Sequence, residues 1–173
     1  MGLAPAPGPA ACLNARRVIR SRDLGIALGT RKERELFKWF LACLLFGKPI
    51  QQEVARRAYL ELAREHLATP DAIVRAGWDR LVEVLDRGHY VRYDFSTATK
   101  LLEICGALRE RYGTLTRLFA VASSEADLRR RLQAFKGIGP TTTRIFLRDA
   151  RPFFRTGPRP VRRPGLARRA RAA

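Results

Sequence analysis

The sequence predicts an all-α fold made of one compact domain, and three observations support this prediction. Apolar residues recur at helical spacing through residues 30–150, and no stretch alternates polar and apolar side chains for long enough to indicate a strand. Residues that favour helix starts and helix ends stand between these segments. The length of 173 residues suits one domain, and a composition that is 46% hydrophobic provides its core. Residues 1–29 and 151–173 are expected to be flexible basic segments on either side.

The first expected helix is central and buried. Thr30 and Glu33 have the spacing of a capping box, in which each side chain bonds to the other residue's backbone N–H. Residues 36–45 are then apolar on nearly every side, which is typical of a helix surrounded by protein. Gly47 and Pro49 are expected to end it.

Three shorter helices are expected between residues 50 and 88. One has an apolar face made of Ile50, Val54, Ala58 and Leu62. Thr69 is an N-cap residue, and Pro70 occupies the first helical position of the next helix. Residues 78–86 form the third, and Gly88 is placed to end it.

A longer helix follows, capped by Asp94 or Ser96 and closed by Gly113. Its apolar stripe consists of Ala98, Leu101, Leu102, Cys105, Leu108 and Tyr112. A shorter helix is expected over residues 114–122. Ser124 and Asp127 start the next one, whose apolar residues are Leu128, Leu132 and Phe135. From Arg151 onward arginine, proline, glycine and alanine show no apolar period, which is typical of a segment that does not fold alone.

The charge of the chain favours an anionic partner. The formal net charge is +18, and residues 151–173 hold eight arginines and no acid. Such an excess is typical of proteins that bind a polyanion, with nucleic acid as the first choice. An arginine-rich composition without functional meaning would give the same charge.

The cysteines and the hydropathy exclude several classes of protein. Cys12, Cys43 and Cys105 are far apart and odd in number, so they indicate neither a disulfide framework nor a metal site. We therefore expect no metal and no cofactor. The longest apolar run, residues 36–46, is too short for a membrane span and contains Lys38. A cytoplasmic protein without a membrane partner is expected.

Residues 135–143, with the sequence Phe-Lys-Gly-Ile-Gly-Pro-Thr-Thr-Thr, are the candidate binding segment. The glycines permit a tight turn and allow the backbone to approach a phosphate closely. Ile138 would plug the turn between two helices. The amides after Gly139 would lie at a helix N-terminus, where free N–H groups and the helix dipole favour an anion. An ordinary glycine-rich link between two helices remains the alternative interpretation.

The segment resembles the helix-hairpin-helix (HhH) of the HhH-GPD superfamily, the endonuclease III and alkyl-adenine glycosylase group of DNA glycosylases. Residues 36–47 resemble the family's buried helix before its DNA-probing loop, and residues 88–94 resemble its glycine-aromatic link. The resemblance covers about residues 31–150. It implies that the partner is duplex DNA, that the protein acts in base-excision repair and that it associates with the nucleoid. We also expect a monomer. The DNA-binding residues that it implies are Lys136, Gly137, Ile138, Gly139, Thr141 and Thr142, with Lys48 in place of the family's helix-entry glutamine.

The catalytic residues of that family are not matched. The lysine nucleophile of its bifunctional members would fall on Thr141, so lyase chemistry is not implied. The family's aspartate would fall near Arg159, where the chain has no acid. Asp149 is the one carboxylate after the hairpin and only a weak catalytic candidate. We expect it instead to be a surface partner of Arg148 or Arg144.

Several interpretations therefore stay open. As an enzyme, the protein would cleave the N-glycosidic bond of a flipped, damaged base. It could equally be a non-catalytic DNA-binding module, or an interaction protein whose hairpin only links two helices. A truncated or frame-shifted gene is a further explanation for the sequence after about residue 149.

Overall fold

The computed structural model describes residues 18–154, and these residues form helices without any strand. The all-α class is confirmed for this part of the chain. Two short 3-10 helices come first and seven α-helices follow: η1 (Ser21–Leu24), η2 (Leu28–Thr30), α1 (Glu33–Phe46), α2 (Gln52–Arg64), α3 (Pro70–Arg87), α4 (Asp94–Arg111), α5 (Leu115–Val121), α6 (Glu125–Gln133) and α7 (Pro140–Phe154).

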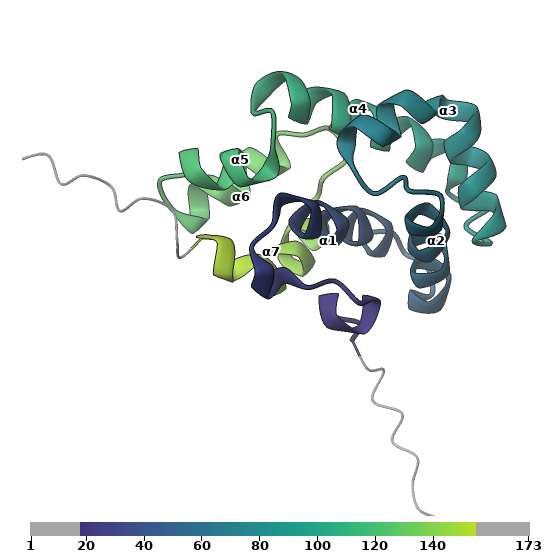
Figure 1. Ribbon diagram of the computed structural model, residues 1–173, viewed down its shortest axis with the longest axis horizontal. Helices are drawn as coiled ribbons and strands as arrows, with labels where there is room; N and C mark the ends of the chain where they lie inside the picture. The colour runs from purple at the N-terminus through teal and green to yellow at the C-terminus, as the bar shows by residue number, and fades with distance from the viewer. Residues whose placement is uncertain (1–17, 155–173) are drawn as a thin grey trace, which may run out of the picture.

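Helix α1 is the centre of the core, as its apolar sequence predicts. Figure 1 shows it in the middle of the molecule, with α2 on one side and α7 on the other. Trp39 is fully buried, and its indole Nε1 donates to the carbonyl of Phe146 on α7 over 3.1 Å. The rings of Phe40 and Phe146 meet edge to face with centroids 5.2 Å apart. These contacts fix α7 against α1 through both packing and a satisfied polar group.

The capping box predicted at the start of α1 is wrong. Thr30 lies inside η2, and Arg31 has a φ of 54°, so the chain turns before the helix begins. Glu33 instead caps α5: its carboxylate accepts from the amides of Leu115 at 2.9 Å and Thr116 at 2.7 Å. A carboxylate near a helix N-terminus is favourable for the helix dipole. Glu33, which the sequence predicted to cap its own helix, thus joins α1 to α5.

Other predicted helix starts are confirmed. The side chains of Thr69, Thr114 and Ser124 each accept a hydrogen bond from the backbone N–H three residues on. The two helices expected between residues 70 and 88 appear as one element, α3, interrupted at Gly77. That residue has a φ of 75° and a ψ of 176°, outside the helical region. The helix is therefore broken at Gly77, one residue before Trp78, where the sequence predicted the next helix to begin.

The connection from α3 to α4 depends on close packing. Gly88 ends α3 as predicted, and a Cβ there would stand 2.6 Å from the Cα of Ala58 on α2. Only a glycine lets the two backbones come so near. The cap expected at Asp94 or Ser96 does not form, because Tyr93 occupies the cap position and no side chain caps α4.

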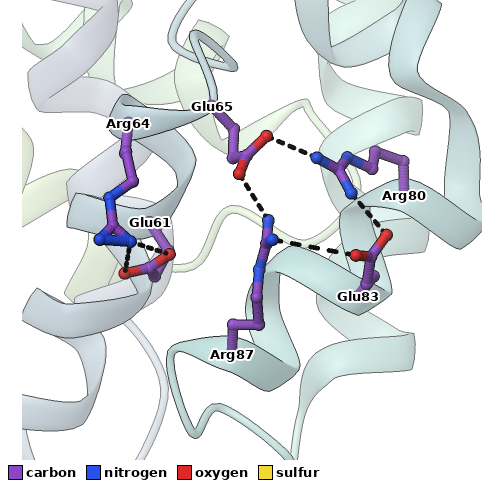
Figure 2. A network of polar contacts seen from close by, with 6 residues as sticks. All are labelled: Glu61, Arg64, Glu65, Arg80, Glu83 and Arg87. Carbon is purple, nitrogen blue, oxygen red and sulfur yellow. Dashed lines mark hydrogen bonds and ion pairs between the residues drawn. The ribbon is translucent and has the colours of Figure 1, made fainter.

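An ionic network joins the end of α2 to α3 (Figure 2). The carboxylate of Glu65 accepts from Arg80 and Arg87, and both arginines also pair with Glu83. Arg80 in particular lowers the pKa of the Glu65 carboxyl. The arginines are 40% exposed, so each pair contributes little, and the contribution weakens with salt.

The folded part of the chain begins before residue 30. Within residues 18–29, which were expected to belong to a flexible segment, the side chains of Leu24, Ile26 and Leu28 are buried in the core. Residues 1–17 lie outside the described part of the chain.

The folded part also extends beyond residue 150. Helix α7 continues to Phe154, and Phe153 is 6% exposed, with its ring centroid 6.1 Å from that of Phe119. The sequence predicted a basic segment from residue 151 because the prolines and arginines around Phe153 show no apolar period. The remainder of that segment, residues 155–173, is outside the described residues.

Candidate nucleic-acid interface

A tight turn over residues 134–139, called the hairpin below, connects α6 to α7. The amide of Ile138 donates to the carbonyl of Phe135 over 3.1 Å, and both side chains are buried. Gly137 has a φ of 98°, a conformation that residues with a Cβ rarely adopt. A Cβ there would also stand 2.9 Å from the Cδ of Lys100. The turn therefore needs glycine at position 137, and Ile138 fills its interior as the sequence predicted.

Helix α7 begins directly after the hairpin, and its first amides have no acceptor within the helix. Its first residue is Pro140, which has no N–H to satisfy. The amide and the hydroxyl of Thr143 both donate to the carbonyl of Gly139, at 3.1 and 3.0 Å. The amides of Thr141 and Thr142 precede that first helical hydrogen bond and have no carbonyl within the helix. They are donors available to an anion at the helix N-terminus.

A pocket of about 250 Å³ opens at these amides. Three separate segments form it: the hairpin with the first turn of α7, the end of α1, and α4. The lining residues are Leu44, Gly47, Lys48, Lys100, Gly137, Gly139, Pro140, Thr141 and Thr142. The structure thus brings Lys48 to the hairpin, two elements that the sequence connected only through a family resemblance. We call this the hairpin pocket.

Two lysines make the hairpin pocket cationic, and its lining includes no carboxylate. Burial and the neighbouring Lys100 lower the pKa of Lys48 from an ordinary 10.5 to about 8. The ammonium group of Lys48 also lies 5.6 Å from the centre of the Tyr93 ring, a weak attraction for a cation. Two cations close together, with no carboxylate among the described residues that line the pocket, make this a candidate site for an anion.

Thr97 adds a polar group that has no hydrogen-bond partner within residues 18–154. Its side chain is 3% exposed, and its hydroxyl oxygen is buried without a hydrogen bond. It lies beside Tyr90, but the Tyr90 hydroxyl donates to the carbonyl of Leu45 over 2.8 Å. Together with Lys48 and Lys100, Thr97 lines a small cavity that adjoins the hairpin pocket. Because an unsatisfied buried hydroxyl is unfavourable, a ligand or water oxygen would be stabilised there.

Lys100 and Thr97 were not predicted from the sequence. Both belong to α4 and lie 34 or more residues before the hairpin, and their spacing carries no signal of its own. Only the packing of α4 beside the hairpin gives them a role.

Other predicted residues lie less directly at the pocket. Lys136 is 84% exposed on its side chain and pairs with Glu103 over 3.2 Å, outside the pocket lining. The Thr142 side chain is buried against Gly47, so its hydroxyl is not open to solvent. A Cβ at Gly139 would meet nothing within 4 Å, so the fold itself does not require that glycine.

Asp149 is a structural residue rather than a surface residue. Its side chain is 8% exposed and accepts from the amide of Ser21 at 3.0 Å and from Arg20 and Arg148 at 3.1 Å each. The expected pairing with Arg148 is confirmed, and the expected surface position is wrong. Asp149 lies about two and a half helical turns from the start of α7. Its contacts hold the N-terminal segment on α7, and they engage both carboxylate oxygens.

A larger pocket, of about 790 Å³, lies away from the hairpin, between the N-terminal segment and the start of α2. Its lining mixes Asp23, Glu53 and Arg56 with two glutamines, and Arg56 already pairs with Glu53. This pocket therefore lacks the excess positive charge of the hairpin pocket.

No protein-family model, curated protein sequence or solved structure matches this chain. Within residues 18–154, no helix has the length and apolar character needed to cross a membrane. The same residues contain no group of three or more His, Cys, Asp or Glu side chains placed to hold a metal ion.

Proposed function

We propose that this protein binds the sugar-phosphate backbone of duplex DNA, with one phosphate in the hairpin pocket. The observation that carries the proposal is the convergence of Lys48, Lys100 and the free amides of α7 on a pocket whose lining has no acid. Amides at a helix N-terminus donate hydrogen bonds to phosphate oxygens, and the lysines neutralise their charge.

The charge of the whole chain favours a nucleic acid over a small anion. A net charge of +18 supplies long-range attraction to a polyanion, beyond what one phosphate needs. The contacts in the pocket would all be made to phosphate, so we expect binding that does not depend on base sequence. The resemblance to the HhH-GPD superfamily supports duplex DNA as the form of nucleic acid.

The proposal concerns binding rather than base excision. Cleavage by the route of the HhH-GPD glycosylases would need a carboxylate beside the flipped nucleotide, and Asp149 is the one candidate that the sequence offers after the hairpin. Asp149 accepts from Arg20, Ser21 and Arg148 at another place on α7. The glycosylase reaction is therefore implied by the resemblance alone.

Fluorescence anisotropy with labelled duplexes of unrelated sequence tests the proposal. The Lys48→Gln, Lys100→Gln double variant should bind about tenfold more weakly at low salt, because it loses two phosphate contacts. Lys32→Gln with Arg34→Gln is a matched control, since it removes two exposed cations at the opposite end of α1. Equal losses in both proteins, or a strong preference of the unmodified protein for one duplex sequence, would contradict the proposal.

A second arm separates binding from catalysis. Duplexes that carry alkylated, deaminated or oxidised bases are incubated with the protein and then heated in alkali, which breaks the strand wherever a base has been removed. We expect intact strands under conditions in which anisotropy shows full binding. Strand breaks made by the unmodified protein would instead show that it also excises bases.

A further inference from the structure

A second cationic surface lies on α7, beyond the hairpin pocket. Starting from Thr141, the residues Arg144, Arg148 and Arg151 follow at steps of three, four and three, which places all four on one face of the helix. These three arginines and Arg129 of α6 line a pocket of about 320 Å³. Its apolar lining residues are Ile145 and Leu147. We call this surface the arginine cleft.

The arginines of the cleft differ in how far they are already engaged. Arg148 is structural, because it donates to the Ile19 carbonyl over 2.9 Å, pairs with Asp149 and lies over the ring of Trp39. Arg129 pairs with Glu125 over 2.6 Å. The positive charges of Arg129 and, more weakly, Arg151 lower the pKa of the Glu125 carboxyl.

Arg144 and Arg151 are the side chains most available to a ligand. Both are exposed, and Arg144 forms no ion pair with another described residue. Glu125 pairs with Arg129 and Asp149 pairs with Arg148, so two carboxylates stand against four guanidinium groups and an excess of positive charge remains over the cleft. Guanidinium groups suit this task because they bind phosphate oxygens in a bidentate manner.

We propose that the arginine cleft is a second phosphate-binding site, which holds the DNA backbone several nucleotides away from the phosphate in the hairpin pocket. This inference depends on the proposed function. Thr141 and Arg151 are separated by about 15 Å along the helix axis, given the rise of 1.5 Å per residue. That length corresponds to about four steps of the duplex at 3.4 Å each. The ligand is accordingly a backbone with several phosphates, and a single phosphate group would occupy only one of the two sites.

The Arg144→Gln, Arg151→Gln double variant tests the second site. DNA affinity is measured by anisotropy over a series of salt concentrations, with a duplex of about 14 base pairs. Loss of two phosphate contacts should reduce the slope of log affinity against log salt by about 1.8, and lower affinity about tenfold or more at low salt.

Arg57→Gln with Arg75→Gln is the matched control. Both arginines are exposed on α2 and α3 and have no ion pair with the residues that the structure describes, so the control removes the same charge elsewhere. Its salt slope should change by less than half as much. Equal slopes in the two double variants would overturn the second site, since total charge alone would then explain binding.

The failure of this inference is distinguishable from failure of the proposed function. If the unmodified protein does not bind duplex DNA at low salt, the proposed function is wrong and the second site falls with it. If Lys48→Gln with Lys100→Gln weakens binding but Arg144→Gln with Arg151→Gln leaves affinity and slope unchanged, only the arginine cleft is wrong. Circular dichroism of each variant confirms that the helices are retained.

Discussion

Gly47 at the end of α1 lies directly against the Thr142 side chain at the start of α7, and a Cβ at position 47 would overlap the Thr142 hydroxyl. This approach brings the residue that follows, Lys48, to the free amides of α7. The glycine therefore has two consequences. It ends the central helix, as the sequence indicates, and it also allows the end of α1 to approach the start of α7, where the hairpin pocket lies.

Gly47→Ala should loosen the contact between α1 and α7. The added methyl group must push Thr142 away from a buried position, which costs on the order of 1–3 kcal/mol of unfolding free energy. Urea denaturation measures this loss. Gly106→Ala is the control, because Gly106 lies inside α4 with open space around its Cα; that variant should be as stable as the parent or more stable. Equal stability of both variants would contradict the proposed contact.

Replacing Lys48 should stabilise the protein while it weakens DNA binding. Burial and Lys100 lower the pKa of Lys48 to about 8, so the charged amine is unfavourable in the folded state. Lys48→Gln should raise the unfolding free energy at pH 7 by on the order of 1 kcal/mol, a value reduced for solvent screening. Parallel urea titrations of the two proteins give the difference. A less stable Lys48→Gln protein at pH 7 would show that the lysine is not under strain.

The pH dependence has a defined sign. Because the folded-state pKa of Lys48 is below its ordinary 10.5, the unfolded chain binds more protons between about pH 8 and 10.5. The contribution of Lys48 to stability therefore rises with pH across this window, and the advantage of Lys48→Gln should vanish by its upper end. DNA binding needs the protonated amine and should weaken as pH rises past about 8. Proton uptake on binding, measured by calorimetry in buffers of different ionisation heat, checks the second statement.

The sequence was most informative where a structural requirement is local. The pattern Gly-Ile-Gly-Pro predicted the turn and the start of α7, because positive φ, a buried plug and a missing N–H are properties of adjacent residues. The caps at Thr69 and Ser124 were predictable for the same reason. Lys100 could not be found in this way, since its role depends on where α4 packs, and Glu33 satisfied a local motif but caps a helix about 80 residues away.

Asp149→Asn should destabilise the protein rather than alter any chemistry at the hairpin pocket. The carboxylate accepts from Ser21, Arg20 and Arg148, and a neutral amide leaves the two guanidinium groups without a counter-charge. We expect a loss on the order of 1–3 kcal/mol in urea denaturation. Glu53→Gln, which breaks an exposed pair with Arg56, should cost much less. DNA affinity of Asp149→Asn, measured where it is fully folded, should match that of the parent; a selective loss of affinity would place Asp149 in the binding site.

The C-terminal boundary of the domain should lie after Phe153. Its ring is buried and packs at 6.1 Å from the ring of Phe119, so Phe153→Ala should lower the unfolding free energy by about 3–5 kcal/mol. Phe95→Ala is the control, because Phe95 is 59% exposed and removal of its ring should have a much smaller effect. A chain that ends at Phe154 should likewise resist urea better than one that ends at Arg151, by a similar amount. Equal midpoints for these two chains, or equal effects of the two alanine substitutions, would place the last turn of α7 outside the folded domain and return the boundary to residue 150.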